Sequence, residues 1–261
     1  MGDLPFERAV ELFGETIRIG AAAGADLVLI ETMSDSYEAK AAVLAAKENC
    51  DLPVLVTLIF DEKGKLLTGG TVDSTVAMLE GLRVDALGVN CGLGPKQMHP
   101  IIERLTQVSS LPIIVNPNAG LPRSENGKTV FDIAPAEFSD LMEEIAGMGV
   151  QALGGCCGTT PEHLRLTIEK CRKVPFRPPV AKRRTVVSSF SQAVEIGPKP
   201  VIIGERINPT GKSKFKAALR ENNIEYILGE GMAQEDSGAH ILDVNVGLPE
   251  IDEPVMMERV V

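Results

Sequence analysis

The stretch that decides the fold of this chain is Gly154-Gly155-Cys156-Cys157-Gly158-Thr159-Thr160-Pro161. It follows a short apolar segment at 151–154, and its proline marks the first turn of a helix, where a missing N–H costs little. An upstream stretch, Val89-Asn90-Cys91-Gly92, has the same arrangement of apolar segment, cysteine, glycine and helix start. Repeated β-then-α units of this kind predict a parallel sheet with crossover helices.

The same alternation extends outward over residues 1–174. We predict strands at 26–30, 53–60, 86–90, 112–115 and 151–154, and helices at 4–23, 36–49, 73–82, 95–108, 135–147 and 161–171. Polar and reactive residues follow the carboxyl ends of the strands, as in a (β/α)8 TIM barrel. A doubly wound open sheet places ligands similarly, but no Gly-x-Gly-x-x-Gly follows a first strand. We therefore expect an α/β chain of the (β/α)8 TIM-barrel type, incomplete at its N-terminal side, with about five βα units.

A proline-rich stretch then interrupts the alternation, and we interpret residues 175–200 as an interdomain linker. Its prolines are Pro175, Pro178, Pro179, Pro198 and Pro200. Residues 201–261 begin a second alternation, with strands at 201–204 and 241–246 and one or two helices between 213 and 238. Because about 60 residues are too few for an independent α/β domain, we expect the first βα units of a second, truncated TIM-type barrel.

Composition limits the possible function classes. The formal net charge of −10 argues against a nucleic-acid partner, and the one basic cluster, at 182–184, is short. No stretch reaches the roughly 18 apolar residues that a membrane helix needs, and the N-terminus lacks the pattern of a secretion signal. Five cysteines, an odd number, then indicate reduced thiols and a cytoplasmic protein.

Three cysteines stand at predicted strand ends: Cys91, Cys156 and Cys157. Three thiolates with an open fourth position suit a catalytic zinc that activates a thiol substrate. The alternative is that a buried cysteine packs as a small hydrophobe, which we would favour for Cys91 alone. Glycines on both sides of the adjacent pair remove packing partners and weaken that alternative. Cys50 and Cys171, at helix ends, are interpreted as packing or surface residues.

Other polar residues have two readings each. Glu31 ends a predicted strand and is suited to bind a substrate ammonium, although a structural carboxylate fits the pattern equally well. Asn116 and Asn118 flank a proline, and turn chemistry explains such a pattern as well as a binding role. His99 and His163 are expected on the exposed side of the first turns of two helices, with no role as metal ligands.

The second alternation also places polar side chains at strand ends. They are Glu205, Asn208, Asp243 and Asn245. Carboxylate and amide groups there are suited to hold a heterocycle that carries both donors and acceptors. Capping of the following helices is the alternative, and the pattern alone favours it.

These motifs resemble a known family. The two cysteine stretches, with Asn116-Pro117-Asn118-Ala119-Gly120-Leu121-Pro122 and Leu29-Ile30-Glu31-Thr32, are similar to the homocysteine-binding module of the homocysteine S-methyltransferases. Gly204-Glu205-Arg206-Ile207-Asn208-Pro209-Thr210-Gly211, followed by Asp243-Val244-Asn245, resembles the start of a pterin-binding module. The two modules in this order, joined by a proline-rich linker, resemble the N-terminal half of the cobalamin-dependent methionine synthases.

The resemblance implies a role for each matching position. Cys91, Cys156 and Cys157 would bind Zn²⁺, with the homocysteine sulfur as the fourth ligand. Glu31 would hold the homocysteine amino group, and Asn118 would lie in the same pocket. The four polar residues of the second alternation would contact methyltetrahydrofolate or lie close to it. The methyl group would pass from the folate to a cobalamin held by a module outside this chain, and then to homocysteine to give methionine.

The resemblance also leads us to expect an internal piece of a longer protein or the product of a broken gene. A glycine-rich first strand with an acidic residue that contacts homocysteine would precede residue 1, and most of the pterin module would follow residue 261. Missing strands would leave two open sheet edges. Two alternatives therefore stay open: a non-catalytic zinc-binding fragment that needs a complementary chain, and a homocysteine or selenocysteine methyltransferase with another methyl donor.

Overall fold

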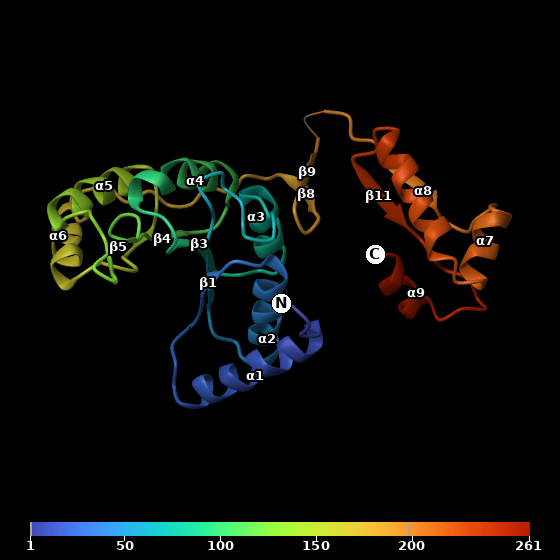
Figure 1. Ribbon diagram of the computed structural model, residues 1–261, viewed down its shortest axis with the longest axis horizontal. Helices are drawn as coiled ribbons and strands as arrows, with labels where there is room; N and C mark the ends of the chain where they lie inside the picture. Colours follow the sequence, from blue (N-terminus) through green and yellow to red (C-terminus); the bar gives the residue numbers. More distant parts are fainter. Residues whose placement is uncertain (1, 198) are drawn as a thin grey trace. The chain divides into compact units, whose positions relative to one another are not determined.

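The computed structural model describes residues 2–197 and 199–261, which divide into two compact units (Figure 1). The first unit contains residues 2–183 and 187–193, and the second contains residues 184–186 and 194–261. Met1 and Pro198, to which we gave places in the first module and in the linker, lie outside the described residues. The boundary between the units falls in the stretch for which we predicted a linker.

A five-stranded parallel sheet forms the centre of the first unit, in the order β1-β2-β3-β4-β7. Its strands are β1 Val28–Met33, β2 Val54–Leu58, β3 Ala86–Asn90, β4 Ile113–Asn116 and β7 Ala152–Leu153. Each strand lies beside the next one of the sheet in chain order, as expected when helical crossovers connect parallel neighbours. The predicted α/β fold with a parallel sheet is confirmed for this unit.

The helices of this unit begin where the local sequence provides a start signal. They are α1 Phe6–Ala22, α2 Ser36–Asn49, α3 Val72–Gly81, α4 Pro95–Val108, α5 Pro135–Gly147 and α6 Pro161–Cys171. The Asp35 side chain accepts hydrogen bonds from the first turn of α2, and Thr71 and Ser74 form a capping box on α3. Helices α4, α5 and α6 each begin with a proline.

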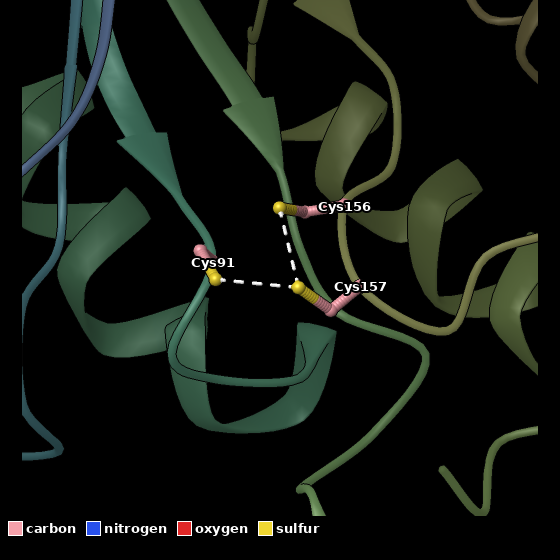
Figure 2. Close-up of side chains that lie close together, drawn as sticks. All are labelled: Cys91, Cys156 and Cys157. Atoms are coloured by element: carbon pink, nitrogen blue, oxygen red, sulfur yellow. Dashed lines mark hydrogen bonds between the residues drawn. The ribbon is translucent and has the colours of Figure 1, made fainter. Parts of the chain in front are cut away.

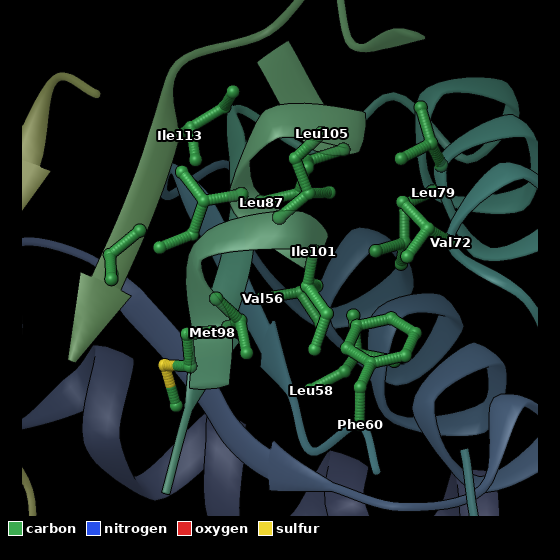
Figure 3. Packing of buried hydrophobic residues seen from close by; sticks show 14 of the residues in the cluster. Val56, Leu58, Phe60, Val72, Leu79, Leu87, Met98, Ile101, Leu105 and Ile113 are labelled. Carbon is green, nitrogen blue, oxygen red and sulfur yellow. The ribbon is translucent and has the colours of Figure 1, made fainter. Parts of the chain in front are cut away.

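An aliphatic core fills the space between the helices and one face of the sheet (Figure 3). Alternate strand residues such as Val56, Leu58 and Leu87 point to this face and are at most 2 % exposed. Ile102 and Leu105 of α4 meet them from the helix layer. Full burial of each such side chain contributes about 1.5–3 kcal/mol, so this face fixes the sheet against its helices.

The opposite face of the sheet carries a mixture of polar, small and aliphatic residues. Thr57, Gly88 and Ile114 are register partners on β2, β3 and β4 and therefore share this face. A Cβ added to Gly88 would lie 1.8 Å from the carbonyl oxygen of Ile114, so only glycine fits between these two strands. Asn90 and Asn116 are also register partners, at the carboxyl ends of β3 and β4.

Two hairpins were not predicted. Strands β5 Arg123–Glu125 and β6 Lys128–Val130 form a hairpin between β4 and α5. Strands β8 Thr185–Ser188 and β9 Ala193–Ile196 form another, so the predicted linker contains regular structure. Phe190, at the tip of this second hairpin, has its ring centroid 6.1 Å from that of Tyr37.

The second unit is built on two parallel strands, β10 Ile203–Ile207 and β11 Ile241–Val244. Helices α7 Ser213–Arg220 and α8 Ile224–Asp236 connect them, and the unpredicted helix α9 Glu253–Val260 follows. A small core contains buried side chains from β10, from all of these helices and from the segment after β11. Its members include Ile207, Phe215, Leu219, Ile227, Val246 and Met256. Across the described part of the chain, the helices are all too short or too polar to cross a membrane.

Candidate metal centre and substrate site

Cys91 lies at the point where β3 leaves the sheet. All five residues of β3 are buried, and the N–H of Cys91 continues the ladder by donating to the carbonyl oxygen of Asn116 at 3.1 Å. Cys91 and Gly92 then have φ angles of +57° and +71°, so the chain turns sharply at this cysteine. A Cβ on Gly92 would lie 2.9 Å from the side chain of Ile59, which leaves glycine as the residue that fits.

The adjacent cysteines follow β7 and are held by the segment after β4. The N–H of Cys156 donates to the carbonyl oxygen of Pro117 at 2.8 Å. The N–H of Cys157 donates to Oδ1 of Asn118 at 3.1 Å, and its carbonyl oxygen accepts from the N–H of Ala119 at 2.9 Å. The backbone of the cysteine pair is therefore fixed by hydrogen bonds to three consecutive residues.

These turns bring the three thiols together (Figure 2). Sγ of Cys157 lies 3.7 Å from Sγ of Cys91 and 3.9 Å from Sγ of Cys156, and all three sulfurs lie within 4.8 Å of one another. With Zn–S bonds of about 2.3 Å, two sulfurs of a tetrahedral site are about 3.8 Å apart. The donor set and its spacing therefore fit a zinc ion, and the exposure of Cys157 leaves one side of the group open to solvent.

The electrostatics of the group explain why a cation suits it. Burial, as the main cause, and the neighbouring Cys91 thiol, as the next, raise the pKa of the Cys156 thiol to about 12. Three neighbouring thiolates would repel one another without a positive charge between them. A bound divalent cation reverses this effect because it favours the deprotonated ligand.

Glu31 lies on the same carboxyl edge of the sheet, in an irregular part of β1. The register of β1 against β2 shifts between Ile30 and Met33, and Thr32 has a φ of +67°. Asn90 exchanges two hydrogen bonds with Thr32, at 2.7 Å and 3.0 Å, although β2 lies between their strands. Strands two positions apart are about 9.6 Å apart in a flat sheet, so this pair requires the sheet to curve and the irregular segment to approach β3.

The Asn90–Thr32 pair ties the strand that carries Glu31 to the strand that ends on Cys91. The Glu31 side chain itself is exposed at this edge. Its binding of a substrate ammonium stays a prediction. Asn90, which the sequence offered only as part of the cysteine stretch, is the residue that our reading of the motif missed. The available sequence signal was its place as a polar residue at the end of a predicted strand, and the structure buries it completely.

Asn118 is 2 % exposed, and its side chain is directed to the backbone of Cys157. Its own N–H donates to the carbonyl oxygen of Leu93, two residues after Cys91. Asn118 therefore links both halves of the thiol group. The predicted contact with substrate stays a prediction, whereas the turn chemistry that we left as an alternative does not describe these long-range bonds.

One expectation about histidine was wrong. His163, predicted on an exposed face, is 5 % exposed and lies between α5 and α6, with its ring edge-on to Phe138. It is buried because its ring caps the start of α6 through Thr160 instead of pointing to solvent. His99 is exposed, as predicted. Cys171 packs against the core, in line with the packing role expected for it.

In the second unit, Asn208 and Asn245 follow the carboxyl ends of β10 and β11, whereas Glu205 and Asp243 lie within these strands. The N–H of Asn245 donates to the carbonyl oxygen of Ile207, next to Asn208. The asparagine side chains accept from nearby backbone groups, Asn208 from Thr210 and Asn245 from Gly247. These are local turn bonds and not the helix caps of the alternative, because α7 and α9 begin after Lys212 and Asp252. Asp243 is exposed on β11, and Glu205 is paired with Lys212 at 3.3 Å.

Fold and site together define an α/β protein with three clustered thiols, spaced as metal ligands, at the carboxyl edge of a parallel sheet. Residues 1–171 match the profile of the family described as homocysteine S-methyltransferase, and the chain belongs to this family. The chain is 34 % identical over 236 residues to methionine synthase from Mycobacterium leprae, and 31 % identical over 236 residues to that from Mycobacterium tuberculosis. Each alignment covers 85 % of this chain but 20 % and 19 % of the relatives, so the chain spans about a fifth of their length.

Solved structures agree with this assignment. The homocysteine methyltransferase MmuM from Escherichia coli is similar in its apo form, with a TM-score of 0.50, 25 % identity, and coverage of 62 % of this chain and 57 % of that one. Its metallated form gives a TM-score of 0.51 at 25 % identity, with coverage of 63 % and 52 %.

Proposed function

We propose that Cys91, Cys156 and Cys157 bind one Zn²⁺ and that homocysteine, as methyl acceptor, supplies its sulfur at the open position to give methionine. The observation that carries this proposal is the sulfur spacing of 3.7 Å and 3.9 Å, which corresponds to the edge of a zinc tetrahedron. When bound, the metal would lower the pKa of the substrate thiol so that it reacts as a thiolate at neutral pH.

The residues of this chain would bind and orient the acceptor. Glu31, exposed on the same edge, would hold the homocysteine ammonium, and the Asn90–Thr32 pair would keep its strand beside Cys91. Asn118 would lie in the homocysteine pocket, as the resemblance implies, and would fix the backbone of Cys157 through its side-chain oxygen. Orientation of this kind is the main contribution a protein makes when the metal supplies the activation.

For the architecture, we propose that the five strands belong to a (β/α)8 TIM barrel. Support comes from the sheet curvature that the Asn90–Thr32 pair requires, and from the likeness to the homocysteine methyltransferase structures. Residues 1–174 would form the homocysteine module, 175–200 the linker, and 201–261 the start of a pterin-binding module with its own TIM-type barrel.

For the methyl donor, we propose methylcobalamin held by another module or protein, with methyltetrahydrofolate as the ultimate source. The similarity to two methionine synthases extends over 85 % of the chain, which is more than the homocysteine module alone. The carboxyl edge of β10 and β11, with Glu205, Asn208, Asp243 and Asn245, would contribute to the folate site. The five free cysteines suit a reducing, cytoplasmic setting.

Metal content and homocysteine binding test the proposal. We expect about one zinc per chain, and a Cys157→Ala variant should lose at least about 100-fold in zinc affinity because a three-sulfur site cannot form. The half-buried Cys50 offers a matched control, since Cys50→Ala removes a thiol remote from the group. Calorimetry should then detect homocysteine binding only by the zinc-loaded chain. Equal zinc content in the Cys157→Ala and wild-type chains would contradict the site, and zinc without homocysteine binding would favour a non-catalytic metal-binding fragment.

A further inference from the structure

His163 has both ring nitrogens engaged in hydrogen bonds. Nδ1 lies 3.2 Å from the backbone nitrogen of Thr160 and 2.8 Å from its Oγ1, while Nε2 lies 3.0 Å from the carbonyl oxygen of Ile133. A backbone N–H can only donate and a carbonyl can only accept. Nδ1 must therefore be the unprotonated nitrogen and Nε2 must carry the hydrogen, so the ring is neutral and its tautomer is defined.

The two partners of this ring belong to different segments around the paired cysteines. Thr160 caps α6 and ends the loop that begins at Cys156. Within that loop, the carbonyl oxygen of Cys156 accepts from the N–H of Thr159 at 3.2 Å and from its Oγ1 at 2.7 Å. The cysteine loop is thus anchored at its downstream end to the helix that His163 caps.

Ile133 leads back to the same cysteines from the other side. Its N–H donates to the carbonyl oxygen of Ala119 at 2.9 Å, and the N–H of Ala119 donates to the carbonyl oxygen of Cys157 at 2.9 Å. In addition, a Cβ on Gly158 would lie 2.4 Å from the ring of Phe131, so the segment before α5 is packed directly on the cysteine loop. The His163 ring connects the two segments directly, since it bonds to Ile133 on one side and to Thr160 on the other.

We propose that His163 is a positioning residue for the metal centre, which fixes the cysteine loop through these two bonds without contacting a ligand sulfur. The part of this proposal that concerns the metal rests on the proposed function, whereas the part that concerns the loop does not. Outer partners that orient metal ligands typically contribute 10- to 100-fold to metal affinity. Because His163 acts through the loop backbone, we expect about the lower end of that range.

The test uses a variant that removes the bond of His163 to Ile133 and keeps the bond to Thr160. In His163→Asn, the side-chain oxygen occupies the place of Nδ1 and keeps the cap on α6, while the donor to Ile133 is lost. The matched control is His99→Asn, which changes an exposed histidine in the first part of α4. Amide hydrogen exchange should become about tenfold faster at Ala119 and Cys157 in His163→Asn, with the α6 amides unchanged. The control should exchange like the wild type.

A metal readout distinguishes positioning from general stability. Cobalt(II) is bound in place of zinc, and its sulfur charge-transfer bands and its rate of loss to a chelator are recorded with the urea unfolding midpoint. We expect about tenfold faster loss from His163→Asn. Wild-type exchange and wild-type cobalt loss in that variant would overturn the proposal, as would uniformly faster exchange throughout the first unit. A wild-type chain that binds no cobalt would instead overturn the proposed function, and the exchange measurement would still decide the claim about the loop.

Discussion

The carboxyl edges of the two sheets carry similar side chains but bond them differently. In the first unit, Asn90 and Asn118 reach partners 58 and 39 residues away in the chain. In the second, Asn208 and Asn245 bond to backbone groups two residues away. Long-range bonds fix segments against one another, whereas local bonds only shape a turn. The difference indicates that the first edge is organised in advance of ligand binding.

The largest expected effect comes from replacing a strand glycine in each unit, Gly88 on β3 of the first and Gly204 on β10 of the second. In Gly88→Ala the new Cβ would lie 1.8 Å from a backbone carbonyl, and β3 and β4 would have to separate. We expect a loss of more than about 4 kcal/mol in the free energy of unfolding. In Gly204→Ala the new Cβ would lie 2.5 Å from the end of the Gln234 side chain, which is able to move.

Moving Gln234 would cost its hydrogen bond from the N–H of Arg206, about 1–2 kcal/mol. Urea unfolding of both variants measures the difference. If both variants lost the same free energy of unfolding, the close approach of β3 and β4 would be no more rigid than the contact of Gly204 with Gln234. A stable Gly88→Ala chain would contradict the close packing of β3 and β4.

A smaller effect is expected from the asparagines. Asn118→Ala leaves the part-buried N–H of Cys157 without its acceptor and should cost about 1–3 kcal/mol. It should also lower zinc affinity about tenfold. Asn245→Ala removes a local turn bond at an exposed position and should cost less than about 0.5 kcal/mol. Thermal unfolding and metal titration check the pair, and an Asn118→Ala chain as tolerant as Asn245→Ala would remove the contrast.

The smallest effect is expected from one exposed glutamate–arginine pair in each unit, and it should be similar in the two units. A hydrogen bond from Arg165 lowers the pKa of the exposed Glu162, and one from Arg220 lowers the pKa of the exposed Glu250. Because these pKa values are lowered on folding, each pair stabilises the chain above the ordinary glutamate pKa and loses its effect as the pH falls below it.

Glu162→Gln and Glu250→Gln should each lower the melting temperature slightly at about pH 7 and not at about pH 3. Melting curves at the two pH values measure this. A large change in melting temperature at either position would mean that the exposed pair stabilises its unit more than solvent-screened charges usually do.

Much of the first unit was predictable because its signals are local. The bounds of α2, α4, α5 and α6 match the predicted ones, since caps and first-turn prolines mark them. The cysteines were singled out by their places at strand ends, and the structure brings their sulfurs together. Their binding of zinc stays a prediction.

The features that were missed either lack a local sequence signal or depend on distant partners. The β5–β6 hairpin is made of exposed, polar residues without the alternation that marks a strand against a core. His163 packs against Phe138 and bonds to the carbonyl oxygen of Ile133, and Ile133 lies thirty residues earlier in the chain. The Asn90–Thr32 pair likewise depends on the curvature of the sheet, which no single stretch of sequence contains.

Each unit contains one tyrosine, which can report on the unfolding of that unit by fluorescence. The chain has no tryptophan and two tyrosines, Tyr37 in the first unit and Tyr226 in the second. Tyr37 lies 5.5 Å from Phe6 and 6.1 Å from Phe190, ring centroid to ring centroid, and Tyr226 lies 6.5 Å from Phe215. Replacing either tyrosine with phenylalanine leaves a single tyrosine, whose emission is stronger than that of phenylalanine, so the unfolding of each unit can be followed in the intact chain without any added label.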